Sequence, residues 1–269
     1  MKTMPENSVD VVLTDPPYLY LKHKLDRPFD EATFFSEIQR IVKPDGFVVI
    51  FGRGASFYRW NTRLAELGFA FKEEIIWDKK RISSPLMALG RRHETISIST
   101  KGKGKIKACK VPYLEMKRYD EAGILRDLKS LKGLLKTKKL DNVIAYLEKN
   151  TVVYSQKRGK ESLTIGAAIA TPDRQVTTLK SIVEGMKEQS IIEVAAERGS
   201  VVIHPTQKPV RLLVRLLALV GAGSNSVVFD PFAGSSGVAV AADEIGAQFV
   251  GSEIDEEYYN AAVRRISAL

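Results

Sequence analysis

Short apolar runs alternate along the chain with segments in which apolar residues recur every third or fourth position. Runs rich in Val, Ile and Phe predict buried strands, and the longer spacing predicts the apolar face of a helix. The predicted strands are 9–14, 47–51, 69–77, 94–100, 226–230 and 248–253. The predicted helices are 31–42, 58–67, 206–220, 237–245 and 255–267, two of them capped by Asp30 and Asp255. This alternation predicts an α/β fold with a doubly wound, mostly parallel sheet and helices on both faces.

Residues 101–200 interrupt the alternation. They contain Lys-Gly repeats and helical patterns near 121–136, 140–149 and 176–189. We therefore predict one α/β domain built from two halves, 1–100 and 201–269, with an inserted region at 101–200.

Charge is concentrated in that inserted region. The chain has 41 Lys and Arg against 32 Asp and Glu, a formal net charge of +9. Residues 101–140 hold thirteen basic and four acidic residues, which is +9, so the rest of the chain is balanced. A concentrated positive stretch favours a polyanion partner, and a solvated lysine-rich linker is the alternative. The predicted phosphate contacts are Lys101, Lys103, Lys105, Lys107, Lys110 and Arg118.

Several other classes of protein are not favoured by the composition. A single cysteine, Cys109, excludes an internal disulfide, and the three histidines lack metal-ligand spacing, so no metal is expected. The N-terminus lacks a signal-peptide core. The longest apolar run, Leu212–Ala222, contains Arg215 and is too short to cross a bilayer. We expect a soluble, cytoplasmic protein with no membrane partner.

The first candidate site is Asp15-Pro16-Pro17-Tyr18, directly after the strand at 9–14. The strand places a carboxylate at its end, and the prolines fix the backbone while leaving their carbonyls free to accept hydrogen bonds. With the flat ring of Tyr18 beside them, these groups suit a planar base that carries an exocyclic amine. The alternative is an ordinary turn in which Tyr18 only packs.

The second candidate site is Asp230-Pro231-Phe232, which ends the strand at 226–230 and is followed by small residues including Gly234 and Ser235. Small residues let the backbone approach a ligand closely, and ligands of open α/β sheets lie at the carboxyl ends of strands. Glu253 ends the next strand, where its carboxylate can hold the hydroxyls of a ribose. Because no phosphate-binding glycine pattern is present, we predict a nucleoside cofactor without phosphates, S-adenosylmethionine.

Together these motifs resemble the β group of DNA amino-methyltransferases, in which the catalytic motif precedes the cofactor motif. The order of parts is the same over about two-thirds of the chain. The matching segments are Asp15–Tyr18, Glu37–Gly46, Arg92–Glu94, His204–Pro209, Asp230–Ser235 and Gly251–Arg265. The resemblance implies a Rossmann-like methyltransferase fold, with catalysis in 1–100, target recognition in 101–200 and cofactor binding in 201–269. It also implies that His204, Thr206 and Lys208 belong to the cofactor-binding residues, together with Asp230, Pro231, Phe232, Gly234, Ser235 and Glu253.

The resemblance further implies methyl transfer from S-adenosylmethionine to a base flipped out of double-stranded DNA. Adenine N6 is preferred, because an Asp at the first position of the catalytic motif usually accompanies adenine in this family, and cytosine N4 is the alternative. Relatives usually begin with a strand upstream of the segment that matches Lys2–Val11. A catalytically impaired DNA-binding protein is therefore a further alternative. A homodimer and a cognate restriction endonuclease are partners that the resemblance leaves open.

Overall fold

The computed structural model describes residues 1–19, 26–82, 88–135, 154–157, 170–172, 174–197 and 202–268. They form two compact units, one made of Met1–Cys109 with Gln189–Leu269 and the other of Lys110–Glu188. The first unit contains both predicted halves, and its boundaries lie at 109 and 189 rather than at 100 and 201. The helix predicted at 140–149 lies outside the described residues.

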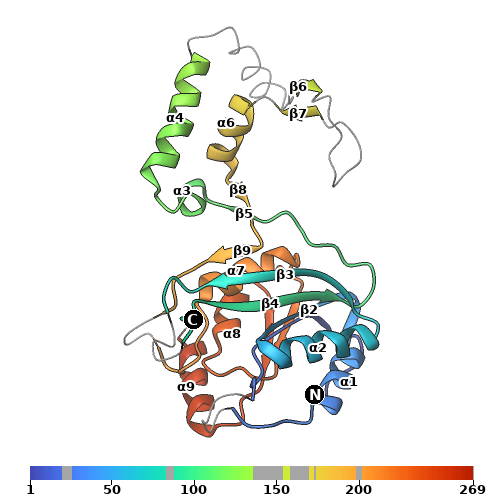
Figure 1. Ribbon diagram of the computed structural model, residues 1–269. Coiled ribbons are helices and arrows are strands. Elements are labelled where there is room, and N and C mark those ends of the chain that lie inside the picture. Colours follow the sequence, from blue (N-terminus) through green and yellow to red (C-terminus); the bar gives the residue numbers. More distant parts are fainter. Residues whose placement is uncertain are drawn as a thin grey trace. The chain divides into compact units, whose positions relative to one another are not determined.

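A seven-stranded sheet forms the centre of the first unit (Figure 1). Its strands are β1 (Val9–Thr14), β2 (Val42–Gly52), β3 (Ala70–Asp78), β4 (His93–Thr100), β9 (Ile191–Glu193), β10 (Val227–Asp230) and β11 (Gln248–Gly251). Their spatial order is β11-β10-β1-β2-β4-β3-β9. Only β4 runs antiparallel to its neighbours, β2 and β3, and the other described pairs are parallel. The predicted mostly parallel α/β sheet is confirmed.

Helices cover both faces of this sheet. They are α1 (Glu31–Ile41), α2 (Gly54–Glu66), α7 (Val210–Leu219), α8 (Gly237–Glu244) and α9 (Glu256–Ile266). Figure 1 shows α1 and α2 on one face and α7 and α8 on the other. Successive strand residues point to opposite faces, so Val12 packs with α1 while Val11 and Leu13 pack with α7. The doubly wound arrangement follows from this alternation.

Local sequence signals set several helix ends. Asp30 accepts the backbone N–H of Thr33 at the start of α1, and Asp255 accepts those of Glu257 and Tyr258 at the start of α9. Both predicted caps are confirmed, and each such cap is worth about 1 kcal/mol. The other end of α1 was predicted one residue too late, because Val42 already pairs with Val9 of β1.

Two boundaries differ more from the sequence prediction. Helix α7 was expected to include Lys208 in its first turn but begins at Val210, with Pro209 as its N-cap in extended conformation. Lys208 therefore lies on the loop before α7 and not in the helix.

Strand β2 was expected to start at 47 but starts at Val42. Val42 pairs with Val9 and Phe47 pairs with Val11, so Lys43–Gly46 forms a bulge within the strand.

The second unit is smaller and mostly helical. Its helices are α3 (Tyr113–Met116), α4 (Glu121–Leu135) and α6 (Arg174–Glu184), and its short strand pairs are β5 (Lys110–Val111) with β8 (Met186–Lys187) and β6 (Tyr154–Lys157) with β7 (Ala170–Pro172). Helix α4 packs beside α6. Helices were predicted at 121–136 and 176–189, so α6 begins and ends earlier than expected. The target-recognition role of this unit stays a prediction.

The sheet has a topological switch point between β1 and β10, where a ligand site is expected. From β1 the chain passes through α1 to β2 on one side, and from β10 it passes through α8 to β11 on the other. Strands β1 and β10 are direct neighbours, so the topology switches between them. Ligands of open α/β sheets bind outside the carboxyl ends at such a switch point. Asp15 and Asp230 lie at these two ends.

Candidate active site

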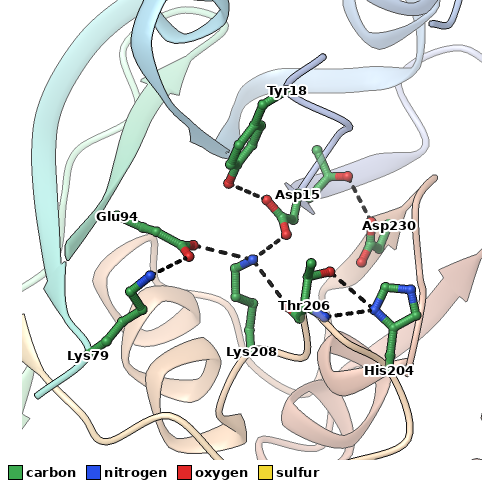
Figure 2. Close-up of polar contacts among 9 residues, drawn as sticks. Asp15, Tyr18, Lys79, Glu94, His204, Thr206, Lys208 and Asp230 are labelled. Atoms are coloured by element: carbon green, nitrogen blue, oxygen red, sulfur yellow. Dashed lines mark hydrogen bonds and ion pairs between the residues drawn. The ribbon is translucent and has the colours of Figure 1, made fainter. Parts of the chain in front are cut away.

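Four charged side chains converge at the carboxyl edge of the sheet (Figure 2). Lys208 Nζ pairs with Asp15 Oδ2 and lies 3.3 Å from Glu94 Oε2 and 3.3 Å from the carbonyl oxygen of Thr206. Lys79 Nζ lies 3.2 Å from Glu94 Oε1. The Lys208 ammonium also lies 5.0 Å from the centre of the Phe51 ring. Two acids and two bases therefore share one mostly buried, electrically neutral cluster.

The cluster shifts the pKa of its members. Burial alone would lower the pKa of Lys208, but the carboxylates of Asp15 and Glu94 outweigh it and raise the pKa above its ordinary value. Burial would raise the pKa of Glu94, yet Lys208 and Lys79 together hold it below its usual range. Burial raises the pKa of Asp15, and the Lys208 ammonium offsets only part of that rise. Near neutral pH, Lys208 and Glu94 are thus fixed in their charged forms.

Tyr18 lies on the other side of Asp15. Its hydroxyl donates to Asp15 Oδ1 at 2.5 Å, and its ring centre lies 6.1 Å from that of Trp60. Ser56 donates to the carbonyl oxygen of Tyr18 at 2.8 Å and so fixes the chain after the two prolines. Pro16 is buried and Pro17 is partly exposed. With Tyr18 on Oδ1 and Lys208 on Oδ2, both oxygens of Asp15 are hydrogen-bonded within the protein.

Asp230 is almost fully enclosed. Thr14 Oγ1 donates to its Oδ1 at 2.8 Å, and the backbone N–H of Phe232 donates to the same oxygen at 3.0 Å. Burial raises the pKa of Asp230 to about 7, although these two donors act in the opposite direction. The side chain is 3% exposed, so its visible role is to join β1 to β10.

The pKa of Asp230 predicts a pH-dependent stability. A carboxyl group whose pKa rises from 3.8 to about 7 on folding stabilises the protein below pH 3.8 and loses this contribution as the pH rises to about 7. The loss is up to about 4 kcal/mol at 1.36 kcal/mol per unit. Asp230→Asn keeps an acceptor for both donors without the charge. Thermal melts of the two proteins from pH 5 to 8 should show a higher, flatter Tm for the variant; parallel curves would contradict this.

The loop after β10 crosses the end of β11. Glu253 Oε2 accepts the backbone N–H of Gly234 at 2.8 Å, and Oε1 accepts that of Asp255 at 2.9 Å. Gly234 has φ of +50°, a conformation that favours glycine, and a Cβ there would be in ordinary van der Waals contact with the His204 ring at 3.4 Å. Ser235 is buried, and its carbonyl oxygen accepts from Arg265 at 3.1 Å. The loop is held by α9 and by Glu253.

Other residues predicted for the cofactor side are brought to the same loop. His204 Nδ1 lies 3.1 Å from Thr206 Oγ1, and its ring meets the Tyr258 ring edge-on at 4.4 Å between centres. The ring of Phe232 packs against those of Phe29 and Phe34, at 5.1 and 5.5 Å. Pro231 accepts from Ser252 through its carbonyl oxygen. Lys208 is the exception, because its ammonium points to Asp15 and Glu94 (Figure 2).

Of the basic residues predicted to contact DNA, Lys101 is not brought together with Asp15. Strand β4 starts at the active-site edge and runs to Thr100, six residues beyond Glu94, which is about 20 Å of extended chain. Lys101 follows on the opposite edge, where its ammonium donates to Asn7 Oδ1 and to the carbonyl oxygens of Gln39 and Val42. In the second unit, Lys110 pairs with Glu184 at 3.8 Å, and Arg118 is exposed.

The contacts of Lys101 predict a role in stability, which is separate from the role in DNA binding predicted for Lys103, Lys105 and Lys107. Lys101→Gln should lower the free energy of unfolding by about 1–3 kcal/mol, because three hydrogen bonds of a charged donor are lost. If Lys103, Lys105 and Lys107 each neutralise a phosphate, changing these three to Gln should reduce the salt slope of DNA binding by about 0.9 per lysine. Urea melts and salt titrations of each variant measure the two effects. An unchanged slope in the triple variant would assign these lysines to solvent.

Sequence reasoning missed two members of the charged cluster. Glu94 was noted only as part of the segment Arg92–Glu94, and Lys79 was not singled out. A signal existed for both, since each lies where a predicted strand meets the loop between 78 and 93. The antiparallel direction of β4 puts Glu94 at the same edge as Asp15, and at the same edge as Lys79, which follows the carboxyl end of β3; this direction could not be inferred from periodicity. Among the described residues, no three His, Cys, Asp or Glu side chains are grouped to hold a metal ion.

The parallel strands β1 and β10 are neighbours at the switch point; Asp15 follows the first and Asp230 ends the second. With a small-residue loop after β10, this arrangement is that of an open α/β protein with a ligand site at the carboxyl ends of its strands. The chain belongs to the DNA methylase family, whose sequence model matches residues 9–264. It is 25% identical to YubD of Escherichia coli (strain K12), a methylase by name, over 100% of this chain and 86% of that protein. It is also 25% identical to the type II methyltransferase M.BglII of Bacillus subtilis, covering 98% of this chain and 65% of M.BglII.

Solved structures share the fold. The PvuII DNA methyltransferase, which is cytosine-N4-specific, superposes with a TM-score of 0.57 at 16% identity, covering 98% of this chain and 81% of that one. The complex of M1.HpyAVI with S-adenosylmethionine superposes with a TM-score of 0.54 at 20% identity, covering 96% and 89%. No helix within the described residues is long and apolar enough to cross a membrane.

Proposed function

We propose that this DNA methylase transfers a methyl group from S-adenosylmethionine to the exocyclic amine of a base flipped out of duplex DNA, with adenine N6 preferred to cytosine N4. The observation that carries the proposal is the position of Asp15, a carboxylate at the switch point next to the β10 strand and its loop. The family match and the S-adenosylmethionine complex of M1.HpyAVI support the cofactor.

The residues around the β10 loop fit such a cofactor. Glu253 presents its carboxylate at the end of β11, and both of its oxygens retain lone pairs beside the two backbone N–H groups that they accept. It would hold the ribose hydroxyls, and the small side chains of Gly234 and Ser235 would let the backbone of the loop approach the cofactor. S-Adenosylmethionine supplies the electrophilic methyl group.

The chain's own residues prepare the nucleophile. The amine of a base is a poor nucleophile because its lone pair is delocalised into the ring. Asp15 and the carbonyl oxygen of Pro16 accept its two hydrogens, which favours a tetrahedral nitrogen with the lone pair free, and Asp15 stabilises the positive charge that develops. Tyr18 stacks on the flipped base, which offsets part of the few kcal/mol that flipping costs. The amine displaces the Tyr18 hydroxyl from Asp15.

The preference for adenine rests on the Asp at the first position of Asp15-Pro16-Pro17-Tyr18. Fold alone does not separate the two bases, because a cytosine-N4-specific enzyme shares it. Expression in a bacterial host without DNA methylases, followed by sequencing of modified bases, tests the proposal. N6-methyladenine at one recurrent sequence is expected, and N4-methylcytosine would replace the preferred base by the alternative.

Absence of both modifications, together with no binding of S-adenosylmethionine, would overturn the proposal. Binding of labelled S-adenosylmethionine to the purified chain then distinguishes an inactive methyltransferase fold, which binds none, from an enzyme that lacks its DNA target in that host. A strain that carries Asp15→Ala serves as the matched negative control. A homodimer and a restriction endonuclease partner stay predictions of the family resemblance, and sedimentation of the purified protein tests the first.

A further inference from the structure

The bridge between two ion pairs in the charged cluster has no assigned role. Asp15 pairs with Lys208 and Glu94 pairs with Lys79, so each acid already has a basic partner. The structure adds a third contact, in which Lys208 also lies 3.3 Å from Glu94. The exposed fractions of Lys79, Lys208 and Glu94 side chains are 9%, 10% and 16%, so little water screens these charges.

Neighbouring ion pairs on the same edge provide a comparison. Glu193 at the end of β9 pairs with Lys80, and Asp78 at the end of β3 pairs with Arg92 at 2.7 Å. These acids are as enclosed as Glu94, with side chains 10% and 14% exposed. Each of these two acids has a basic partner other than Lys208. Ion pairing alone therefore does not require the contact between Glu94 and Lys208.

We propose that Glu94 is a positioning residue for methyl transfer: it shares the Lys208 ammonium with Asp15 and so keeps the Asp15 carboxylate basic enough to accept a hydrogen bond from the base amine. This inference rests on the proposed function of Asp15. Without Glu94, Lys208 would pair with Asp15 alone and neutralise the charge that the amine needs. Lys79, bound to the other oxygen of Glu94, limits how far Glu94 can draw Lys208 away.

The groups that face Asp15 determine the sign of each effect. Lys208 and the Tyr18 hydroxyl contact it directly, Glu94 lies across Lys208, and Asp230 ends the adjacent strand. The negative charge of Glu94 raises the pKa of Asp15. Glu94→Gln should therefore lower that pKa. Lys79→Met removes a positive charge behind Glu94 and should raise it.

Direct titration of Asp15 tests this without any methyl transfer. The full chain, labelled with 13C at aspartate carboxyl groups, is titrated by NMR, and the Asp15 signal is identified from Asp15→Asn. The pKa of Asp15 should fall in Glu94→Gln and rise in Lys79→Met. It should not change in the matched control Glu193→Gln. Equal pKa values in all proteins, or shifts of the same sign in both variants, would overturn the proposal. If Glu94→Gln does not fold, the direction of the change in the Asp15 pKa in Lys79→Met decides: a rise supports the proposal, and a fall or no change overturns it.

Kinetics provide the second readout. For Glu94→Gln, kcat should fall about tenfold at pH 8, the acid limb of its pH profile should move to lower pH, and the Kd for S-adenosylmethionine should be unchanged. Glu94→Asp retains the charge and should restore the position of the limb. A lower kcat with an unmoved limb would assign Glu94 a structural role only. If wild-type protein transfers no methyl group, the proposed function fails, and the NMR titration still decides whether Glu94 controls Asp15.

Discussion

Replacing Asp15 by alanine is expected to abolish methyl transfer, with kcat reduced at least a hundredfold, the order seen when one group that stabilises a developing charge is removed. The Kd for S-adenosylmethionine should change little, because the proposed cofactor contacts come from Glu253 and the loop after β10. The fold should persist, since Lys208 keeps Glu94 as a carboxylate partner. A tritium-methyl transfer assay beside isothermal calorimetry measures both quantities.

The control for this variant is Asp243→Ala, which removes an exposed carboxylate from α8 on the same half of the fold. It should leave both quantities unchanged. Equal losses of cofactor affinity and activity in Asp15→Ala would contradict the division of labour between the ends of β1 and β10. Full activity in that variant would remove Asp15 from the mechanism altogether.

Replacing Glu253 by alanine is expected to weaken S-adenosylmethionine by about 10- to 100-fold, because hydrogen bonds from two ribose hydroxyls to a carboxylate would be lost. The variant also loses acceptors for the N–H groups of Gly234 and Asp255, so its Tm should fall. DNA affinity measured without cofactor should hardly move. Calorimetry at a temperature well below the Tm separates the loss of binding from unfolding.

Two controls make this result specific. Glu257→Ala changes an exposed acid in the first turn of α9 and should leave the cofactor Kd unchanged. Glu253→Gln keeps one acceptor oxygen and should show an intermediate Kd. An unchanged Kd in Glu253→Ala, together with a lowered Tm, would limit Glu253 to fixing the β10 loop and the start of α9.

The sequence alone determined most of the sheet and both of the residues that end its central strands. Buried strands and amphipathic helices are set by local periodicity, and caps such as Asp30 and Asp255 depend on side chains within three residues of the helix start. Asp15 and Asp230 were found for the same reason, because each directly follows an apolar run. Boundaries failed where local signals compete, as at Pro209, which makes α7 begin about one turn later than its apolar pattern predicted.

Only the tertiary structure decided which side chains meet at the site. Lys208 was placed on the cofactor side from sequence, but it is 193 residues from Asp15 and contacts it across the switch point. The antiparallel direction of β4 brings Glu94 beside them and carries Lys101 to the far edge of the sheet. Periodicity specifies which face a strand buries but not the direction in which it runs, since both directions satisfy the same alternation. Strand direction, and with it the membership of the charged cluster, therefore follows from packing of the whole sheet.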